Sequence, residues 1–329
     1  MDVSLLQVDG LRTHFFTKAG VVKAVDDVSF TVERGEVLGL VGESGSGKSV
    51  TGYSIMGLVD PPGRIVAGNL HLLGRDLRIM GEEDLRQLRG NRVAMIFQDP
   101  MMTLNPVLRI DAQMIETILA HRDVSRAAAR DEARSALAKV GIPSPDERLS
   151  AYPHQFSGGM RQRVAIAIAL LNDPVLVIAD EPTTALDVTI QGQILFEMQK
   201  LTRKTGAAMI WITHDLSVIA GLADRVCVMY AGRIVEQGTV FDVLSQPRHP
   251  YTRGLLDSVP SMRPRGARLA QIPGMAPSPF AAPAGCAFRD RCGHATVACK
   301  TMPAMRPVAG AASGQSVRCH HPLRAEVTT

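Results

Sequence analysis

The stretch VLGLVGESGSGKSV, residues 37–50, joins an apolar run to a glycine-rich turn and then to a segment that can form a helix. The turn satisfies the pattern G-x-x-x-x-G-K-[ST], in which backbone N–H groups curl around phosphate oxygens, the lysine supplies positive charge and the last hydroxyl can bind magnesium. A flexible surface turn is the alternative, but the flanking strand and helix favour a phosphate-binding loop. The expected contacts come from Gly42, Glu43, Ser44, Gly45, Ser46, Gly47, Lys48, Ser49 and Val50.

A second informative stretch covers residues 156–187. A small-residue loop, FSGGM, opens a helix whose N–H groups and dipole favour an anion, and the chain returns through the apolar run VLVIA to two adjacent carboxylates. Asp180 is expected to hold magnesium through its water shell, and Glu181 to orient or deprotonate an attacking water. An acidic pair after a strand is usually only a solvated loop, but a phosphate-binding loop in the same chain favours the catalytic interpretation.

Apolar runs alternate with helix-like segments through most of the chain, which predicts an α/β fold with a parallel sheet covered on both faces. Residues 111–139 are alanine-rich, charged and helical in pattern, which indicates a helical subdomain inserted into the sheet domain. From about residue 247 prolines, glycines and arginines predict a separate loop-rich region. The predicted strands are Val37–Val41, Val93–Phe97, Val175–Ala179, Ala207–Ile212 and Arg225–Tyr230.

The length of 329 residues fits one large domain with an appendage. The formal net charge of +4 is small for this length and gives no indication of nucleic-acid binding. The longest apolar stretch near the middle, residues 164–171, is far shorter than the roughly 20 residues of a membrane-spanning helix. The N-terminus lacks the pattern of a secretory signal, so we expect the chain to remain in the cytosol and to act at a membrane only through a partner.

Six motifs stand in one order along about the first 245 residues, and together they resemble the motif set of ABC-type ATPases. The resemblance implies a P-loop NTPase (RecA-like) ABC ATPase domain at residues 1–246, with an N-terminal β subdomain and the helical subdomain inserted at about 99–164. It implies ATP and Mg2+ as cofactors, with Ser49, Gln98 and Asp180 at the magnesium. The motifs are Gly42–Ser49, Gln98, Phe156–Met160, Asp180-Glu181, Ala185–Asp187 and His214.

The same resemblance assigns further roles. Ser157, Gly158 and Gly159 would form the signature that touches the γ-phosphate held by a facing subunit, and Asp187 would lie in the loop linking the two halves. Gln98 would also sense the transmembrane partner. His214 would be the switch histidine at the γ-phosphate, although a lone histidine there otherwise suggests a capped strand end.

Such ATPases usually stack adenine on an aromatic ring upstream of the phosphate loop. Phe16 is the residue we assign, with Phe15 beside it, and packing of either ring in the core is the alternative.

A narrower resemblance, to the dipeptide and oligopeptide importer ATPases, covers nearly the whole chain. It rests on QDP at 98–100, LNP at 104–106, FSGGM at 156–160, ADEPTTALD at 179–187 and HPY at 249–251. Met160 replaces the glutamine usual in ABC signatures, and methionine is familiar in this subfamily.

This resemblance implies an ATPase at the cytoplasmic face of the inner membrane that drives peptide uptake. Its partners would be a second ATPase, usually a distinct paralogue, two transmembrane permease subunits and an extracytoplasmic substrate-binding protein, with a homodimer as the alternative. Nickel, glutathione or opines are alternative cargoes. A soluble ABC ATPase acting on nucleic acid or ribosomes would favour tandem domains or long coiled-coil insertions, and a non-hydrolysing regulator would lack Lys48, Glu181 or His214; the sequence shows neither pattern.

Four of the five cysteines cluster near the C-terminus, at Cys286, Cys292, Cys299 and Cys319. In a reducing cytosol such a cluster indicates a metal rather than disulfides, because metal–thiolate bonds can staple a region that lacks a core. The spacing differs from the close pairs of common zinc ribbons. Because some importer ATPases carry a four-cysteine iron-sulfur cluster in this region, residues 247–329 are expected to form an extension holding a [4Fe-4S] cluster. Zn2+ and inconsequential reduced thiols are the alternatives, and His294, His320 and His321 are alternative ligands if one of the cysteines is not used.

Overall fold

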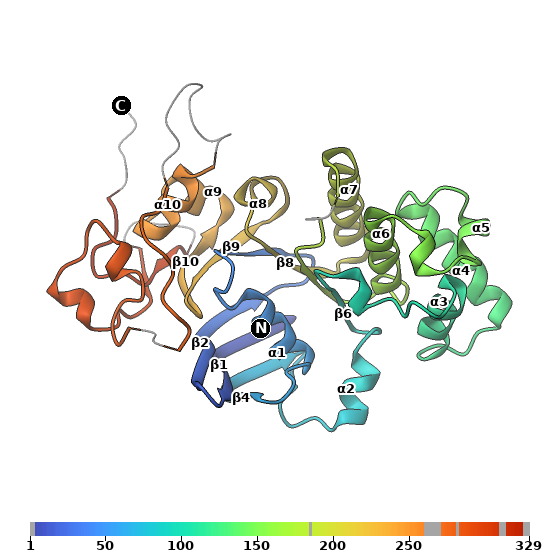
Figure 1. Ribbon diagram of the computed structural model, residues 1–329, viewed down its shortest axis with the longest axis horizontal. Coiled ribbons are helices and arrows are strands. Elements are labelled where there is room, and N and C mark those ends of the chain that lie inside the picture. The colour runs from blue at the N-terminus through green and yellow to red at the C-terminus, as the bar shows by residue number, and fades with distance from the viewer. Residues whose placement is uncertain (1–3, 184–185, 260–270, 281–282, 309–313, 325–329) are drawn as a thin grey trace. The chain divides into compact units, whose positions relative to one another are not determined.

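The computed structural model describes the chain except residues 1–3, 184–185, 260–270, 281–282, 309–313 and 325–329, and it also leaves out the side chains of residues 188 and 201 (Figure 1). The chain forms two compact units. Unit 1 comprises Met1–Val32, Val37–Arg78 and Ile212–Thr329, and unit 2 comprises Glu33–Glu36 and Ile79–Trp211.

Unit 1 contains a four-stranded antiparallel sheet with the strand order β2-β1-β4-β5. Apolar and polar residues alternate along its first strand, and an irregularity in the strand pairing between Val8 and Leu11 shifts the alternation, so that Leu6, Val8 and Leu11 are all buried. The strands are β1 Leu6–Thr17, β2 Gly20–Val32, β4 Gly63–Leu72 and β5 Arg75–Asp76.

The other strands of unit 1 follow the order β11-β12-β10-β9-β3. Every residue of β3, Val37–Val41, is buried, as expected for a strand covered on both faces, and it runs parallel to β9, Arg225–Tyr230. The predicted parallel arrangement ends there, because β10 and the two short strands beyond it are antiparallel. Those strands are β10 Arg233–Thr239, β11 Arg306–Pro307 and β12 Ser316–Val317.

The helices of unit 1 are short and lie beside these strands in Figure 1. They are α1 Lys48–Met56, α8 Leu216–Leu222, α9 Val240–Ser245 and α10 Pro250–Asp257. Beyond α10 the described residues contain only the 3-10 turns η4 Arg289–Arg291 and η5 Val297–Lys300 and the strands β11 and β12, in agreement with the predicted loop-rich region.

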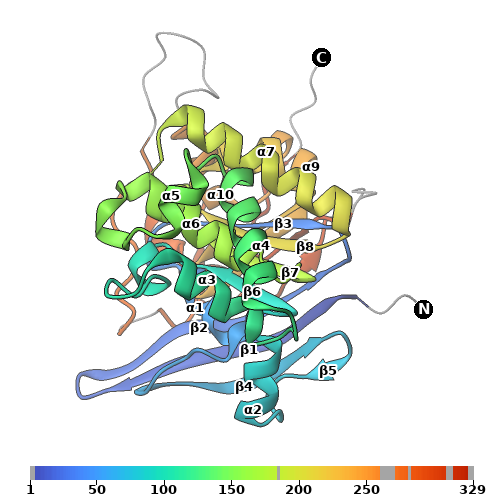
Figure 2. The same ribbon diagram turned by 90° about the vertical axis from the view of Figure 1, so that its right-hand side faces the viewer.

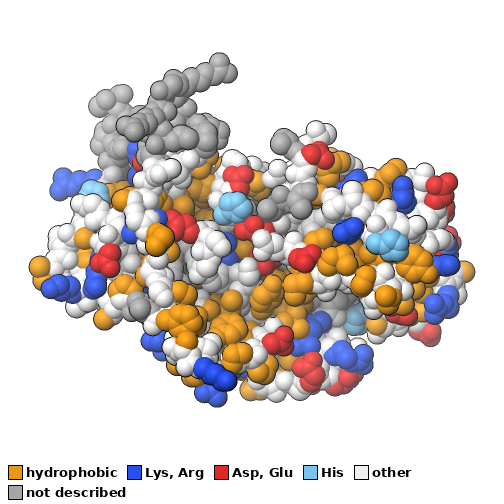
Figure 3. Space-filling model, viewed as in Figure 1, with side chains coloured by type: hydrophobic (Ala, Val, Ile, Leu, Met, Phe, Trp, Pro, Cys, Tyr) orange, Lys and Arg blue, Asp and Glu red, His pale blue; other side chains and the backbone are white. Residues whose placement is uncertain are grey.

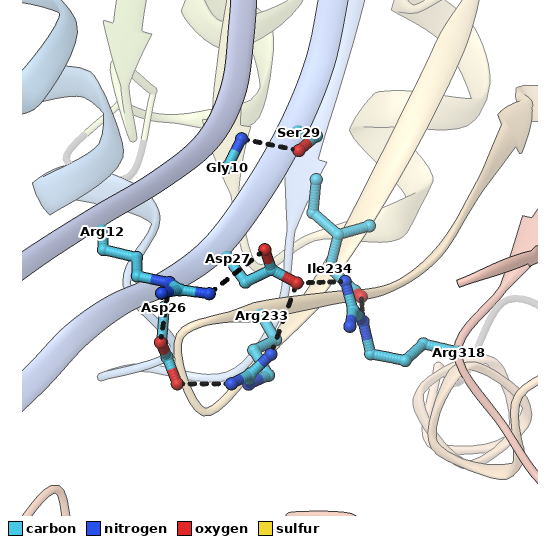
Figure 4. A network of polar contacts seen from close by, with 8 residues as sticks. All are labelled: Gly10, Arg12, Asp26, Asp27, Ser29, Arg233, Ile234 and Arg318. Carbon is cyan, nitrogen blue, oxygen red and sulfur yellow. Dashed lines mark hydrogen bonds and ion pairs between the residues drawn. The ribbon is translucent and has the colours of Figure 1, made fainter. Parts of the chain in front are cut away.

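An ion-pair network ties this C-terminal region to the antiparallel sheet (Figure 4). Arg318 donates to Asp27 and to the carbonyl of Ile234, each at 3.1 Å. Arg233 pairs with Asp26 at 2.6 Å, and Arg12 adds longer contacts to both aspartates. Arg318 is only 12% exposed and Asp27 33% exposed, so the pair is partly buried and its loss should cost more than that of a fully exposed ion pair.

Unit 2 contains the strand order β8-β7-β6, of which β6 and β7 are parallel. The strands are β6 Val93–Ile96, β7 Leu176–Asp180 and β8 Ala208–Thr213, the last of which runs on into unit 1. Each predicted strand in this unit is therefore present, with its ends shifted by at most one residue.

Helices α3 to α6 of unit 2 pack on one another (Figure 2). The predicted helical region 111–139 is two helices, because the polar segment 121–125 interrupts it. Small side chains, Ala129 and Ala133, face the core from α4 and let α3 approach, where Met114 and Ile118 are buried. The helices of the unit are α2 Glu82–Leu88, α3 Ile110–Leu119, α4 Arg126–Lys139, α5 Pro145–Leu149, α6 Gly158–Ala169 and α7 Val188–Thr205, with 3-10 turns η1 Pro100–Met102 and η2 Pro153–Gln155.

Hydrophobic side chains also reach the surface of this unit, and orange patches interrupt the charged residues over α3 to α6 on the right of Figure 3. Met102 and Val107, between β6 and α3, are 64% and 75% exposed. Within the described ranges, no helix is both long enough and apolar enough to cross a bilayer.

Candidate functional site

The glycine-rich loop of unit 1 is held against other backbone segments so closely that two of its positions require glycine. Gly42 and Gly47 have φ values of 155° and 101°, which residues with a side chain rarely adopt. A Cβ atom at Gly42 would lie 2.2 Å from the carbonyl oxygen of Met229, and one at Gly47 would lie 2.3 Å from that of Ala24. The loop geometry therefore depends on β9 and β2 as well as on its own sequence.

Lys48 begins α1 and folds back over this loop. Its Nζ atom donates to the carbonyl oxygens of Gly42 at 2.8 Å and Glu43 at 3.0 Å, and the side chain is buried. Gly47, in the left-handed conformation, gives α1 no side-chain cap, so the helix N-terminus keeps N–H groups that can bind an anion. Ser49, in the first turn of the helix, is half-buried.

Glu43 is held through both its backbone and its side chain. Its backbone N–H donates to the Tyr251 hydroxyl at 2.8 Å, and its carboxylate receives two bonds from Arg291, at 2.8 and 3.0 Å. The pair with Glu43 raises the pKa of Arg291, and burial raises the pKa of Tyr251, so Arg291 stays charged and Tyr251 stays neutral. Neither contact with Glu43 is predictable from the sequence, because nothing near the loop points to residues so far along the chain.

Within the HPY triplet, His249 and Pro250 position Tyr251. The Nδ1 atom of His249 accepts the backbone N–H of Tyr251 at 3.0 Å and so caps α10, while Pro250 occupies its first turn. The backbone N–H of His249 donates to the buried carboxylate of Glu236 at 2.9 Å. Burial lowers the pKa of His249 to about 3, which keeps the ring neutral and able to accept.

The aromatic residues predicted for adenine stacking and the predicted switch histidine also belong to unit 1. Phe16 is 39% exposed and lies under the guanidinium of Arg64, 4.2 Å from the ring centroid. Phe15 is half-buried and packs against Gly63, where a Cβ atom would lie 2.6 Å from its ring. This difference favours Phe16 over Phe15 as the residue open to a ligand. His214 is exposed and directly follows β8.

Unit 2 carries the predicted acidic pair at the carboxyl end of β7. Asp180 is the last residue of this buried strand and is 1% exposed. Glu181 follows it with a φ of 45°, a left-handed conformation that is costly for glutamate and that turns the chain sharply after the strand. Gln98 is exposed just beyond β6, the neighbouring parallel strand.

The remaining predicted residues of unit 2 stand at the N-termini of two helices. The Ser157 hydroxyl caps α6 by accepting the N–H of Met160 at 3.3 Å, and Ser157 and Gly158 are exposed. Asp187 caps α7 by accepting the N–H of Ile190 at 3.0 Å and is exposed too. Thr184 and Ala185, in the motif before Asp187, lie outside the described residues.

The four C-terminal cysteines line a single small hollow, which we call the cysteine hollow, together with His249, His294, His320 and His321. All four thiols are free, and burial raises the pKa of Cys319 to about 11. Where side chains are described, no three or more histidine, cysteine or acidic groups stand in an arrangement that could hold a metal ion. The predicted metal staple is therefore not formed in this structure, although its donors converge.

Comparison with known proteins agrees with this geometry. The family model "ABC transporter" matches residues 25–184, and "Oligopeptide/dipeptide transporter, C-terminal region" matches residues 235–299. The dipeptide transport ATP-binding protein DppD of Escherichia coli (strain K12) is 47% identical, and the match covers 98% of each chain. DppD of Bacillus subtilis (strain 168) is 51% identical, over 90% of this chain and 88% of the relative. The oligopeptide transport ATP-binding protein OppD of Salmonella typhimurium is 47% identical, over 97% and 94%.

Among solved structures, the dimeric bacterial ABC transporter cassette MJ0796 superposes with a TM-score of 0.66 at 25% sequence identity. The match covers 71% of this chain and 98% of the cassette.

A phosphate-binding loop with a folded-back lysine and a buried strand ending in paired carboxylates are features of ATP-hydrolysing P-loop proteins, and the family match identifies this chain as an ABC transporter ATPase, which couples ATP hydrolysis to transport. Within that class the chain belongs to the family of dipeptide and oligopeptide transport ATP-binding proteins, which the resemblance of its motifs indicated.

Proposed function

We propose that this ATPase powers an importer that carries dipeptides or oligopeptides across the cytoplasmic membrane. One observation carries the proposal: the likeness to the Escherichia coli dipeptide transport protein extends over 98% of both chains and so includes the C-terminal region. Nickel, glutathione and opines are the rival cargoes on the same machinery. A soluble ABC ATPase acting on nucleic acid or ribosomes is disfavoured, because the match to transport proteins runs through both family regions.

The proposed roles in hydrolysis follow the chemistry of each group. Lys48 and the N–H groups of residues 42–50 bind the phosphates of ATP, and Phe16 stacks on the adenine. Ser49, Gln98 and Asp180 hold Mg2+, which when bound neutralises charge on the phosphates. Glu181 accepts a proton from the attacking water, and His214 contacts the γ-phosphate. The buried, folded-back Lys48 and the constrained backbone of Glu181 support these roles.

The signature residues act on a second subunit. Ser157, Gly158 and Gly159 open the twelve-residue helix α6, and the N–H groups there suit a phosphate that this chain does not itself bind. Asp187 lies in the loop that links the two halves. ATP held between two subunits stabilises only their closed arrangement, so binding closes the pair and hydrolysis reopens it.

The partners and location proposed for the chain are those of a peptide importer. They are a second, distinct ATPase, two transmembrane permease subunits and an extracytoplasmic substrate-binding protein, with this chain peripheral at the cytoplasmic face. The exposed Met102 and Val107, just beyond β6, give unit 2 an apolar surface suited to a permease subunit. We place the ATPase domain at residues 1–246, its inserted helical subdomain at about 99–164 and the C-terminal extension at 247–329; the packing of α3 to α6 on one another supports the inserted subdomain.

The extension is proposed to hold a [4Fe-4S] cluster on Cys286, Cys292, Cys299 and Cys319, with Zn2+ as the alternative. Four thiols line one hollow and are the ligand type that both groups take, although they would have to move closer together to bind either one. Backbone N–H groups already donate to the sulfurs of Cys292 and Cys319, at 3.4 and 3.3 Å, as they do to cluster ligands. At Gly285 a Cβ atom would lie 2.3 Å from the carbonyl oxygen of Cys299, so the two cysteine segments are in close contact.

Metal analysis tests this assignment. Anaerobically purified protein should be brown and contain about four irons and four sulfides per chain. The variant C292S should lose the cluster, whereas C227S, which changes a cysteine buried in β9, should keep it. A colourless protein that contains one zinc ion per chain would show that the site binds zinc and not an iron-sulfur cluster.

Transport tests the cargo. The chain is co-expressed with the products of neighbouring genes, and uptake of labelled di- and oligopeptides is measured beside uptake of nickel and glutathione. ATP-dependent uptake of a peptide, absent in the variant K48A, is the expected result. Uptake of nickel or glutathione without peptide uptake would reassign the cargo and leave the ATPase function intact.

A further inference from the structure

The C-terminal extension contacts the phosphate loop at Glu43, the second residue of that loop. Three groups hold it: the Tyr251 hydroxyl accepts its N–H, Lys48 donates to its carbonyl and Arg291 pairs with its carboxylate. Two of the three come from the extension. Neither Tyr251 nor Arg291 lies in any motif of the ATPase domain, and all these residues belong to unit 1.

Arg291 is itself fixed on several sides. Its Nε donates to the carbonyl of Pro273 at 2.8 Å, and one guanidinium nitrogen donates to the Tyr230 hydroxyl at 3.2 Å. The guanidinium also lies over the rings of Tyr230 and Phe288, 5.8 and 5.9 Å from their centroids. The side chain is only 7% exposed, so Arg291 reaches the loop as a rigid and desolvated cation.

The charge of this ion pair is important for ATP binding, because the Glu43 carboxylate belongs to the loop that binds the phosphates. The loop binds the phosphates of ATP, and the Glu43 carboxylate would otherwise add negative charge beside them. The two parallel N–H···O bonds from Arg291 neutralise that charge and fix the direction of the side chain. Without them, Glu43, whose carbonyl accepts from Lys48, is held only by its two backbone contacts, with Tyr251 and with Lys48.

We propose that Arg291 is a positioning residue for ATP binding, which acts through Glu43 to hold the phosphate loop and Lys48 in the conformation that receives the nucleotide. Arg291 closes η4 and directly precedes Cys292 in the cysteine hollow. The extension that carries the cysteines thereby sets the affinity of the ATPase domain for ATP.

The test measures MgATP binding to the full-length chain by displacement of a fluorescent ATP analogue, and KM and kcat for ATP hydrolysis in the assembled transporter. R291A should raise the KM and the dissociation constant for MgATP about tenfold, as expected for partners in contact. The value of kcat should change less than twofold, because Arg291 touches none of the groups assigned to the chemistry. A purely structural role would instead lower kcat through the active fraction and leave KM unchanged.

Two further variants make the test specific. In the E43A background, R291A should change KM less than twofold, because the residue through which Arg291 acts is gone. R289A removes the same charge from the same short turn, where Arg289 pairs only with the exposed Asp290 among the described contacts, and it should behave as wild type.

R291K keeps the charge and most of the packing, and it serves if R291A does not fold. It should raise KM about threefold, because lysine cannot form the two parallel bonds, and it should have no such effect in the E43A background. An unchanged KM in R291A, or in R291K if R291A does not fold, would overturn the proposal. An equal rise in R289A, or an undiminished effect in the E43A background, would do the same.

Discussion

The hydroxyl of Tyr251 accepts a hydrogen bond from the backbone N–H of Glu43 at 2.8 Å, although 208 residues separate the two in the chain. The HPY triplet therefore contacts the phosphate loop directly. His249 caps the helix that presents Tyr251, and Pro250 begins that helix. The C-terminal extension of this ATPase therefore helps to hold its phosphate loop in place.

Y251F should weaken ATP binding by a factor of about three to ten, because one hydrogen bond to the loop backbone is lost. The ring should keep its packing against Tyr230 and Phe288, so the thermal midpoint should fall little. Titration of the full-length chain with MgATP measures the effect, and Y152F, which alters a half-buried tyrosine of unit 2, is the control. Equal affinities of Y251F and Y152F for MgATP would show that the hydrogen bond between Tyr251 and Glu43 does not contribute to ATP binding.

K48A should lower the affinity for ATP and abolish transport, because the loop then lacks the cation that its carbonyl groups hold in place. The expected loss in kcat/KM is about a hundredfold or more, the size found when a preorganised charge is removed from a phosphate site. K23A, which removes a lysine from β2, should retain activity. Full hydrolysis by K48A would contradict the assignment of the phosphate loop.

E181Q should bind ATP but fail to turn it over, because an amide cannot accept the proton of the attacking water. We expect kcat to fall about a hundredfold to ten-thousandfold, and the ATP-bound pair of subunits to accumulate in its closed form. ATPase assays and size-exclusion chromatography with ATP measure the two effects. E197Q, in which a surface glutamate of α7 loses its pairing with Lys200, is the matched control. Unchanged turnover of E181Q beside its native partners would exclude Glu181 as the base.

Acidification should destabilise the C-terminal extension through His249. The folded pKa of His249, about 3, lies below the value near 6.5 of the unfolded chain, so the unfolded state binds the proton more readily. Its contribution to stability is therefore complete above about pH 6.5 and is lost as the pH falls toward 3. Between pH 7 and pH 5 the loss amounts to about 2 kcal/mol.

The comparison with H249N isolates this effect. Burial raises the pKa of the neighbouring Glu236, which acts in the opposite direction, but that contribution is present in both proteins. Denaturant midpoints at pH 7 and pH 5 should show the stability advantage of the wild type over H249N shrinking as the pH falls. An advantage that is the same at both pH values would mean that His249 is not held neutral.

Local patterns in the sequence predict the elements of this fold well, because a strand or a helix depends on the spacing of apolar residues near one another in the chain. The five predicted strands are present, with ends shifted by one residue at most. The two short antiparallel strands β11 and β12 were not predicted, since two-residue strands such as Ser316–Val317 carry no periodicity. The segment 111–139 was predicted as one helical region, and the polar residues between Leu119 and Arg126 divide it.

The sequence by itself determined the class of this protein. A phosphate loop, an acidic pair after a buried strand and a helix-opening signature are each encoded within a few residues, so their chemistry can be recognised before any contact is known. Only the tertiary structure decided what holds the loop. Glu43 and Arg291 lie 248 residues apart, and no pattern in the sequence relates them. Their pairing exists because the packing of the extension within unit 1 buries Arg291 beside Tyr230 and Phe288, where the Glu43 carboxylate is its charged partner.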